Sequence, residues 1–246
     1  MRAKNVVVMG GAVEHSGNMS PIAEFNTYAD TIAAARVFAL SSPNPASTMP
    51  PSPPPSSNSQ GDDSTLRSSL PPYPQNEELG SKRLKVILFP LDITTRHSLR
   101  RDDFDAKVLP LVSKGSPLAE WMNAWVSATF HKMEVLHHGH EGGGTALDLH
   151  DPLCVWYALK GESQKNDWKI ITEDIRVETT GQWTRGMCVV DRRDRKKGNA
   201  DDGEGGEVPG DIGGWLHPSK GNRIGRCIRT PGERALAPYL LDTIFG

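Results

Sequence analysis

The sequence predicts an α/β fold with an open, mostly parallel sheet, interrupted by a disordered insertion rich in proline and serine. Two continuous apolar runs, Val6–Met9 and Val86–Phe89, are typical of strands buried in a sheet. Residues 30–40 and 103–136 carry apolar side chains at helical spacing. Residues 41–82 hold too few apolar side chains to offset the entropy of ordering them.

The composition excludes several classes of partner. The 246 residues include 28 basic and 30 acidic side chains, so a net charge of -2 gives no overall attraction to nucleic acid or to an anionic membrane. No segment approaches the ~20 successive apolar residues of a membrane helix, which predicts a soluble protein. The three cysteines, Cys154, Cys188 and Cys227, form no CxxC pair, and this favours a reducing, cytoplasmic location.

The remaining elements follow from local patterns. Trp121, Met122, Trp125, Val126 and Phe130 have the spacing of an amphipathic helix, and helices of this region are expected to cover the sheet. Asp151 and Pro152 are favourable in the first turn of a helix, with Asp151 as its cap. Two further strands and a closing helix are predicted at Ile170–Glu178, Met187–Val190 and Ala235–Phe245.

These elements divide the chain into folded pieces around the insertion. The first piece spans residues 5–40, the insertion spans 41–82, and the remainder spans 83–246, with a flexible, Gly-rich excursion at 191–225.

Two local patterns are too weak to define a site. His137, His138 and His140 form an HHxH spacing that is common in solvated loops, and no carboxylate completes a zinc pattern. Gly10 and Gly11 follow a strand, but they are not part of a GxGxxG motif and no helix begins at once. The sequence therefore predicts neither a zinc site nor a dinucleotide site there.

The loop after the first predicted strand concentrates groups that can bind hydroxyls. Asn18, Glu24 and Asn26 follow Val6–Met9, and ligand sites of open α/β sheets form at the carboxyl ends of strands. Carboxylates accept hydrogen bonds and amides both donate and accept them, which suits a small polyol. The alternative is equally weighted: the two asparagines supply turns and Glu24 starts a helix.

A second candidate group opens the helix after residue 148. His150 and Asp151 place an imidazole beside a carboxylate at a helix N-terminus, where the imidazole could act on a substrate. Spacing alone favours the other interpretation, in which Asp151 caps the helix and His150 is incidental.

Taken in order, these motifs resemble the carboxyl-terminal part of the inosine-uridine preferring nucleoside hydrolases. The motifs are MGG-x5-GN-x4-AEFN at Met9–Asn26, FPLDIT at Phe89–Thr94 and HDP at His150–Pro152, and Thr184–Asp191 is similar to a late strand of that family. The resemblance covers residues 5–40, 84–160 and 170–195.

The resemblance implies a partial sheet of the nucleoside hydrolase type and hydrolysis of the N-glycosidic bond of a small-molecule ribonucleoside. In this family a bound calcium ion activates the attacking water. Asp151 matches a calcium ligand, and His150 matches the residue that protonates the departing base. Many relatives form dimers or tetramers, so a homo-oligomer is possible. Carried over by position, the ribose-contacting residues are Met9, Asn18, Glu24, Asn26 and Asp151.

The sequence departs from the family at its amino-terminal DxDxxxDD motif, which supplies most calcium ligands and the general base. That motif is absent, and Asp62-Asp63 and Asp201-Asp202 lie in segments without neighbouring structure to hold them. Calcium takes about six to eight oxygen ligands, so the ligand set is incomplete. We therefore expect a truncated chain with impaired activity. The alternatives are a non-catalytic ribose-binding remnant, an incomplete gene model, or a chain that needs a separately encoded front half.

Overall fold

The computed structural model describes residues 5–50, 83–136, 145–195 and 208–246. The chain forms two compact units. The first comprises residues 1–6, 11–87 and 172–225, and the second comprises residues 7–10, 88–171 and 226–246.

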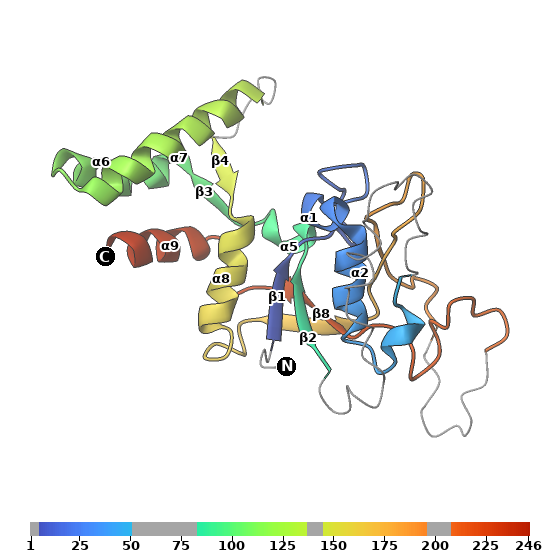
Figure 1. Cartoon of the computed structure of the whole chain (residues 1–246). Coiled ribbons are helices and arrows are strands. Elements are labelled where there is room, and N and C mark those ends of the chain that lie inside the picture. The colour runs from blue at the N-terminus through green and yellow to red at the C-terminus, as the bar shows by residue number, and fades with distance from the viewer. Residues whose placement is uncertain (1–4, 51–82, 137–144, 196–207) are drawn as a thin grey trace, which may run out of the picture. The chain divides into compact units, whose positions relative to one another are not determined.

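The main sheet is open and has the strand order β1-β2-β8-β5 (Figure 1). Its strands are β1 (Asn5–Met9), β2 (Lys85–Phe89), β8 (Ile224–Arg229) and β5 (Lys169–Glu173). The sheet is mostly parallel, as expected where neighbouring strands such as β1 and β2 are joined through helices. The predicted α/β class is confirmed.

The two predicted apolar strands differ in burial. Val86–Phe89 is buried throughout, as predicted, whereas Val6–Met9 is only half-buried. The reason is the strand order: within the part of the chain that the structure describes, β1 is an outer strand and β2 lies between β1 and β8. Strand β2 is therefore covered by a neighbouring strand on each side.

The first unit contains α1 (Phe25–Ala29), α2 (Thr31–Ala39) and the antiparallel pair β6 (Arg176–Val177) and β7 (Cys188–Val189). Helix α2 confirms the predicted helix at residues 30–40. It begins at Asp30, whose Oδ1 accepts a hydrogen bond from the Ala33 N–H at 2.8 Å. Phe38 is buried on the face of α2, which packs on β6.

The chain stays folded beyond Leu40, where the insertion was predicted to begin. Ser41 and Ser42 are buried, and the Ser41 hydroxyl donates to the Phe38 carbonyl at 2.6 Å, so it binds the end of α2. A short 3₁₀ helix, η1 (Pro45–Ser47), follows with proline in its first turn. The predicted start of the insertion, at residue 41, is wrong because serine and proline also occur at the ends of helices. Residues 51–82 of the predicted insertion lie outside the described residues.

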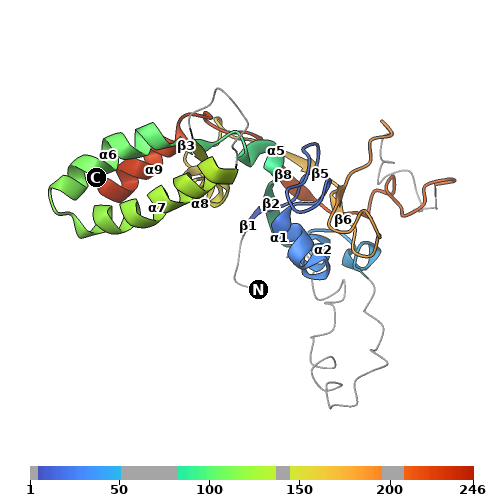
Figure 2. The same ribbon diagram turned by 90° about the horizontal axis from the view of Figure 1, so that it is seen from above.

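In the second unit, α6 (Arg101–Ser113) packs against both α7 (Pro117–Leu136) and α9 (Leu236–Phe245) (Figures 1 and 2). The ring centroids of Phe104 and Phe130, both fully buried, lie 6.0 Å apart. The predicted helices at 103–136 and 235–245 are confirmed. Trp121 and Trp125 of the predicted apolar stripe are instead 64% and 47% exposed.

The main strand partners of these helices are not in the four-stranded sheet. They are β3 (Ser98–Arg100) and β4 (Ala146–Asp148), an antiparallel pair with Ser98 opposite Asp148. The expectation that the helices cover the main sheet is thus corrected. The sequence patterns did not predict β3, β4 or β8.

The predicted strand Ile170–Glu178 is divided in two. Residues 169–173 form β5 of the main sheet, and residues 176–177 form β6, which pairs with β7. The strand predicted at Met187–Val190 is confirmed as β7. Among the helices of the described residues, none is long and apolar enough to cross a bilayer.

Strand β8 contains a buried charge that gives a test of the fold. Arg226 lies 3.7 Å from Asp92 (Nη1 to Oδ1), and the two side chains are only 7% and 11% exposed. Arg226→Ala would leave the Asp92 carboxylate buried without this cation. We expect the free energy of unfolding to fall by about 3–5 kcal/mol, measured by urea denaturation.

The matched control is Arg229→Ala, at the exposed end of the same strand. It should change the free energy of unfolding by no more than about 0.5 kcal/mol. Equal losses in the two variants would show that the buried pair does not stabilise the fold.

Candidate functional site

The loop that carries the first candidate residues is shaped by backbone hydrogen bonds to one carbonyl. The Ala23 carbonyl accepts from the N–H groups of Asn18, Met19 and Ser20 at 3.0–3.3 Å. A Cβ atom at Gly17 would collide with the backbone of Ala23 and Ser20, so only glycine fits there. The glycine of the GN pair is therefore a requirement of the turn.

Glu24 holds this loop to helix α1. Its Oε2 accepts hydrogen bonds from the N–H groups of Gly11 at 2.8 Å and Thr27 at 3.0 Å, and its Oε1 accepts from Asn26 at 2.8 Å. The residue is 1% exposed and is the N-cap of α1. The structure thus bears out the second interpretation of Glu24, that it starts a helix.

The two asparagines lie at the surface of the same unit. Asn18 is exposed, and its Oδ1 accepts from the Phe25 N–H at 2.9 Å, which leaves its amide NH₂ group pointing away from that bond. Asn26 is exposed in the first turn of α1. The structure therefore brings Asn18, Glu24 and Asn26 together around the start of one helix. Met9 ends β1, half-buried, and belongs to the second unit.

His150 and Asp151 open helix α8 (His150–Lys160) in the second unit. The N-cap is Leu149, which makes no side-chain cap, so the expectation that Asp151 caps the helix is wrong. Asp151 is exposed in the first turn, where a carboxylate interacts favourably with the helix dipole. The Leu149 N–H donates to the His97 carbonyl at 2.7 Å, which ties the start of α8 to the preceding segment.

The His150 imidazole has a defined partner on each side of the ring. Its Nδ1 lies 2.8 Å from the hydroxyl oxygen of Thr94, the last residue of α5 (Leu91–Thr94). Its Nε2 lies 3.7 Å from the Asp148 carboxylate. Neither Thr94 nor Asp148 was predicted as a site residue, although Thr94 ends the FPLDIT motif.

An apolar cavity adjoins these residues. It has a volume of about 520 Å³ and is contained within the second unit. Helix α7 contributes Trp125 and Val126, and His150 and Asp151 supply polar groups to the wall. This combination of apolar lining and a few polar groups is typical of small-molecule sites.

A second histidine in this unit has a structural role. His97 is fully buried, with Nδ1 3.0 Å from the Ile93 carbonyl and Nε2 2.9 Å from the Thr230 hydroxyl. Burial lowers the pKa of the His97 imidazole, although the bond to the Ile93 carbonyl acts to raise it. The ring is therefore kept neutral and uses both nitrogens within the protein.

The calcium ion implied by the family resemblance does not fit the described residues. Across residues 5–50, 83–136, 145–195 and 208–246, no group of three or more His, Cys, Asp or Glu side chains is placed to hold a metal ion. Asp151 is one exposed carboxylate, and calcium needs about six to eight oxygens. Asp62, Asp63, Asp201, Asp202 and the histidines at 137–140 lie outside the described residues.

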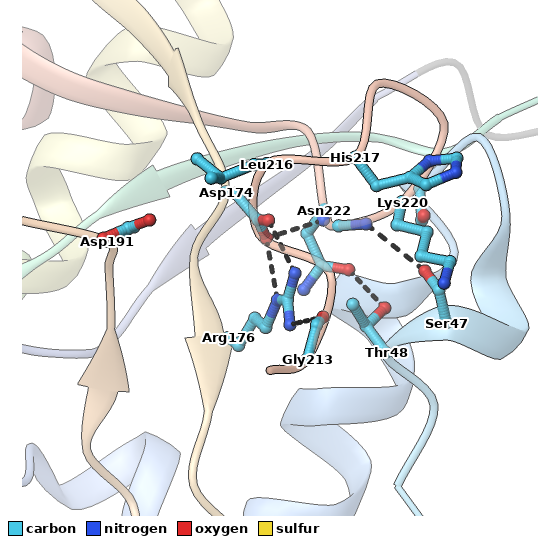
Figure 3. Close-up of polar contacts among 12 residues, drawn as sticks. Ser47, Thr48, Asp174, Arg176, Asp191, Gly213, Leu216, His217, Lys220 and Asn222 are labelled. Atoms are coloured by element: carbon cyan, nitrogen blue, oxygen red, sulfur yellow. Dashed lines mark hydrogen bonds and ion pairs between the residues drawn. The ribbon is translucent and has the colours of Figure 1, made fainter. Parts of the chain in front are cut away.

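A polar cluster in the first unit holds the segment after residue 208 (Figure 3). Arg176 donates to the Asp174 carboxylate at 2.9 Å and to the Gly213 carbonyl at 2.7 Å. The Asn222 N–H donates to Asp174 at 2.8 Å, and the Thr48 hydroxyl donates to the Asn222 side chain at 2.6 Å. These bonds join β6, η1 and the Gly213 loop, so the cluster stabilises the unit.

A cavity of about 710 Å³ lies beside this cluster. Its wall includes Ser47, His217 and Lys220, but Ser47 and His217 already bond to protein groups: Ser47 donates to the Asn44 carbonyl at 2.6 Å, and His217 accepts from the Ser219 N–H at 3.2 Å. None of the family motifs contributes to it, and we assign it no ligand.

The family model described as inosine-uridine preferring nucleoside hydrolase matches residues 1–57 and 74–206. The chain belongs to this family, which confirms the resemblance found in the sequence motifs.

Two curated relatives illustrate the match. An uncharacterized protein of Schizosaccharomyces pombe is 27% identical over 191 residues, which cover 77% of this chain and 44% of that protein. The pyrimidine-specific ribonucleoside hydrolase RihA of Salmonella newport is 25% identical over 186 residues, or 76% of this chain and 42% of that protein. The chain thus spans less than half the length of these relatives.

Solved structures confirm the fold. A plant nucleoside hydrolase matches with a TM-score of 0.57 and 14% identity, covering 97% of this chain and 52% of that chain. A purine-preferring ribonucleoside hydrolase from Gardnerella vaginalis matches with a TM-score of 0.52 and 15% identity, covering 96% and 49%.

Glu24→Gln tests the carboxylate that holds the first candidate loop. The substitution places an NH₂ group against backbone N–H donors, so at least one of them loses its acceptor. We expect the free energy of unfolding to fall by about 1–3 kcal/mol. Met19→Ala, exposed in the same loop, should change it by about 0.5 kcal/mol or less. Equal stability of Glu24→Gln and the unsubstituted chain in urea denaturation would contradict this role.

His97 predicts a pH dependence of stability. The unfolded imidazole has a pKa of about 6.5 and the folded one lies lower, so the unfolded chain binds more protons between the two values. The stabilising contribution of neutral His97 is complete above about pH 6.5 and falls as the pH drops toward the folded pKa.

Urea denaturation between about pH 7.5 and about pH 5.5 measures this effect. His97→Gln should show a smaller loss of stability on acidification than the unsubstituted chain. His131→Gln, with a side chain that is 76% exposed, should leave the pH dependence unchanged. A slope that is the same in all three proteins would refute the assignment.

Proposed function

We propose that the chain acts in hydrolysis of the N-glycosidic bond of ribonucleosides. In this reaction water adds to the anomeric carbon of ribose, the bond to the base breaks, and the base leaves with a proton. The observation that carries the proposal is the start of α8, where His150 and Asp151 border an apolar cavity of about 520 Å³. Membership of the nucleoside hydrolase family supports it.

In the second unit, we assign proton transfer to His150 and ribose binding to Asp151. A nucleobase has a flat aromatic face, which can pack in a cavity lined by Trp125 and aliphatic side chains. An imidazole at the rim of that cavity can protonate the departing nitrogen, and protonation lowers the barrier to bond cleavage. The exposed Asp151 carboxylate suits ribose hydroxyls and the positive charge that develops on the sugar. Met9 is proposed to line the sugar pocket.

In the first unit, we assign ribose contacts to Asn18, Glu24 and Asn26. The exposed Asn18 amide can donate to a hydroxyl because its Oδ1 already accepts from Phe25. Glu24 uses three of about four lone-pair positions on backbone N–H groups, so it can offer a single remaining position, on Oε1. Its role in binding is accordingly smaller than its role in shaping the loop.

We further propose that turnover by the chain alone is slow. Among the described residues, Asp151 is not part of any group of three or more His, Cys, Asp or Glu side chains placed to hold a metal ion, so they do not supply the carboxylates that tight calcium binding and water activation need. The alternative is a non-catalytic nucleoside-binding protein, which the exposed asparagines and the apolar cavity would also support.

We propose a cytoplasmic location from the state of the thiols. All three cysteines are free in the structure. Burial raises the pKa of both Cys154 and Cys227 to about 12, so neither forms a reactive thiolate at neutral pH. Buried free thiols are typical of proteins kept in a reducing compartment.

Purified full chain incubated with uridine or inosine separates these proposals. Release of free base, followed by chromatography with added calcium and with a chelator, should occur below about 1 s⁻¹. Turnover at about 10 s⁻¹ or more would overturn the claim of slow turnover. Nucleoside binding in calorimetry that is equal with and without chelator, with no base released, would favour the binding protein.

His150→Ala tests the proposed proton donor. Residual base release should fall by about 10²–10⁴-fold, most for inosine because purines leave more readily once protonated. Asp151→Ala should also reduce release, through loss of ribose binding. His131→Ala, an exposed histidine on α7, is the matched control and should retain full activity. Unchanged rates in His150→Ala would remove His150 from the mechanism.

A further inference from the structure

Thr94 is buried against the candidate proton donor. It is 0% exposed, and its hydroxyl oxygen lies 2.8 Å from Nδ1 of His150. The other ring nitrogen, Nε2, lies 3.7 Å from the Asp148 carboxylate, whose side chain is 47% exposed. One nitrogen of the imidazole therefore contacts the protein interior and the other lies at the partly exposed edge of the ring.

The contact is fixed by elements on both sides. The N–H groups of Ile93 and Thr94 both donate to the Pro90 carbonyl at 3.1 Å, so the single turn of α5 is closed. The Leu149 N–H donates to the His97 carbonyl, and β3 pairs with β4 up to Asp148. Thr94 and His150 are thus held close together by backbone bonds, although 56 residues separate them in the sequence.

The two neighbours favour one proton position on the ring. The Asp148 carboxylate lies 3.7 Å from Nε2, too far for a hydrogen bond, but its negative charge favours hydrogen on that nitrogen in the neutral ring. Nδ1 is then an acceptor, and the Thr94 hydroxyl is its donor.

We propose that Thr94 is a positioning residue that fixes the ring of His150 and holds Nδ1, so that Nε2 is the nitrogen presented for proton transfer. The assignment of a catalytic purpose rests on the proposed function. The geometric assignment, that the Thr94 hydroxyl donates to Nδ1 and so favours the Nε2–H tautomer of His150, is independent of any turnover.

His97 provides an internal comparison. Its Nδ1 faces the Ile93 carbonyl, which only accepts, so this ring is the opposite tautomer with hydrogen on Nδ1. Both nitrogens of His97 are used within the protein, whereas His150 has one nitrogen at a partly exposed edge. The two rings should therefore give opposite patterns in the same spectrum.

The test is the tautomer of His150 in the full chain labelled with ¹⁵N. Two-bond ¹H–¹⁵N spectra, recorded well above the ordinary histidine pKa of about 6.5, distinguish a protonated from an unprotonated ring nitrogen. The unsubstituted chain should show His150 as the Nε2–H form and His97 as the Nδ1–H form. A predominant Nδ1–H form of His150 in this chain would overturn the proposal without recourse to any variant.

Thr94→Val removes the hydroxyl at nearly constant volume. It should shift the tautomer ratio of His150 by about five- to tenfold toward a mixture, the effect of one lost hydrogen bond, and leave His97 unchanged. Thr94→Ser should restore the original ratio. Failure of the serine variant to restore it, or an unchanged ratio in Thr94→Val, would overturn the proposal.

Thr95→Val is the matched control. The Thr95 hydroxyl donates to the Leu91 carbonyl at 2.8 Å and does not contact His150, so its loss should leave the ratio unchanged. If base release is measurable, Thr94→Val should lower kcat with little change in KM. If no release is measurable in any protein, the proposed function fails, while the tautomer measurements still decide the role of Thr94.

Discussion

Backbone N–H groups at the start of a helix need acceptors, and the way each unit supplies them sets the geometry of the candidate residues. In the first unit a single buried carboxylate, Glu24, accepts from two N–H groups of α1 and from Gly11. In the second unit α8 begins at Leu149 without a side-chain cap and is held by the His97 carbonyl. The side chains of His150 and Asp151 are therefore not used to cap the helix that carries them.

The sequence predicted those helices and strands whose pattern of apolar side chains lies within the element itself. Val86–Phe89 and residues 31–39 show their burial in the spacing of apolar side chains, and both elements were found. Strand β8 was missed because it carries Arg226 in a buried position, and the charge opposite it, Asp92, is distant in sequence. Strands β3 and β4 have three residues each, too few for a pattern to show. The structured residues 41–50 were missed because their composition is that of a linker.

The candidate site likewise has parts that the sequence predicts and parts that it does not. Motif order proposed Asn18, Glu24 and Asn26 as candidates, as well as the histidine and aspartate that open α8, because those residues lie in short segments of the sequence. Neither motif order nor spacing could reveal that Thr94 contacts His150, since this depends on the register of β3 and β4. In the sequence, Glu24 fits two interpretations, a ribose contact and the start of a helix. Its hydrogen bonds to the Asn26 and Thr27 N–H groups show that it starts a helix.

The turn around Ala23 has a consequence for how this family can diverge. Its path is determined by main-chain atoms converging on one carbonyl and by a glycine that admits no substituent, whereas Asn18 and Met19 project outward. The shape of this turn and the chemistry of its surface are consequently determined by different atoms. Selection can exchange an outward side chain such as Met19 without having to rebuild the scaffold beneath, whereas Asn18 also accepts from the Phe25 N–H.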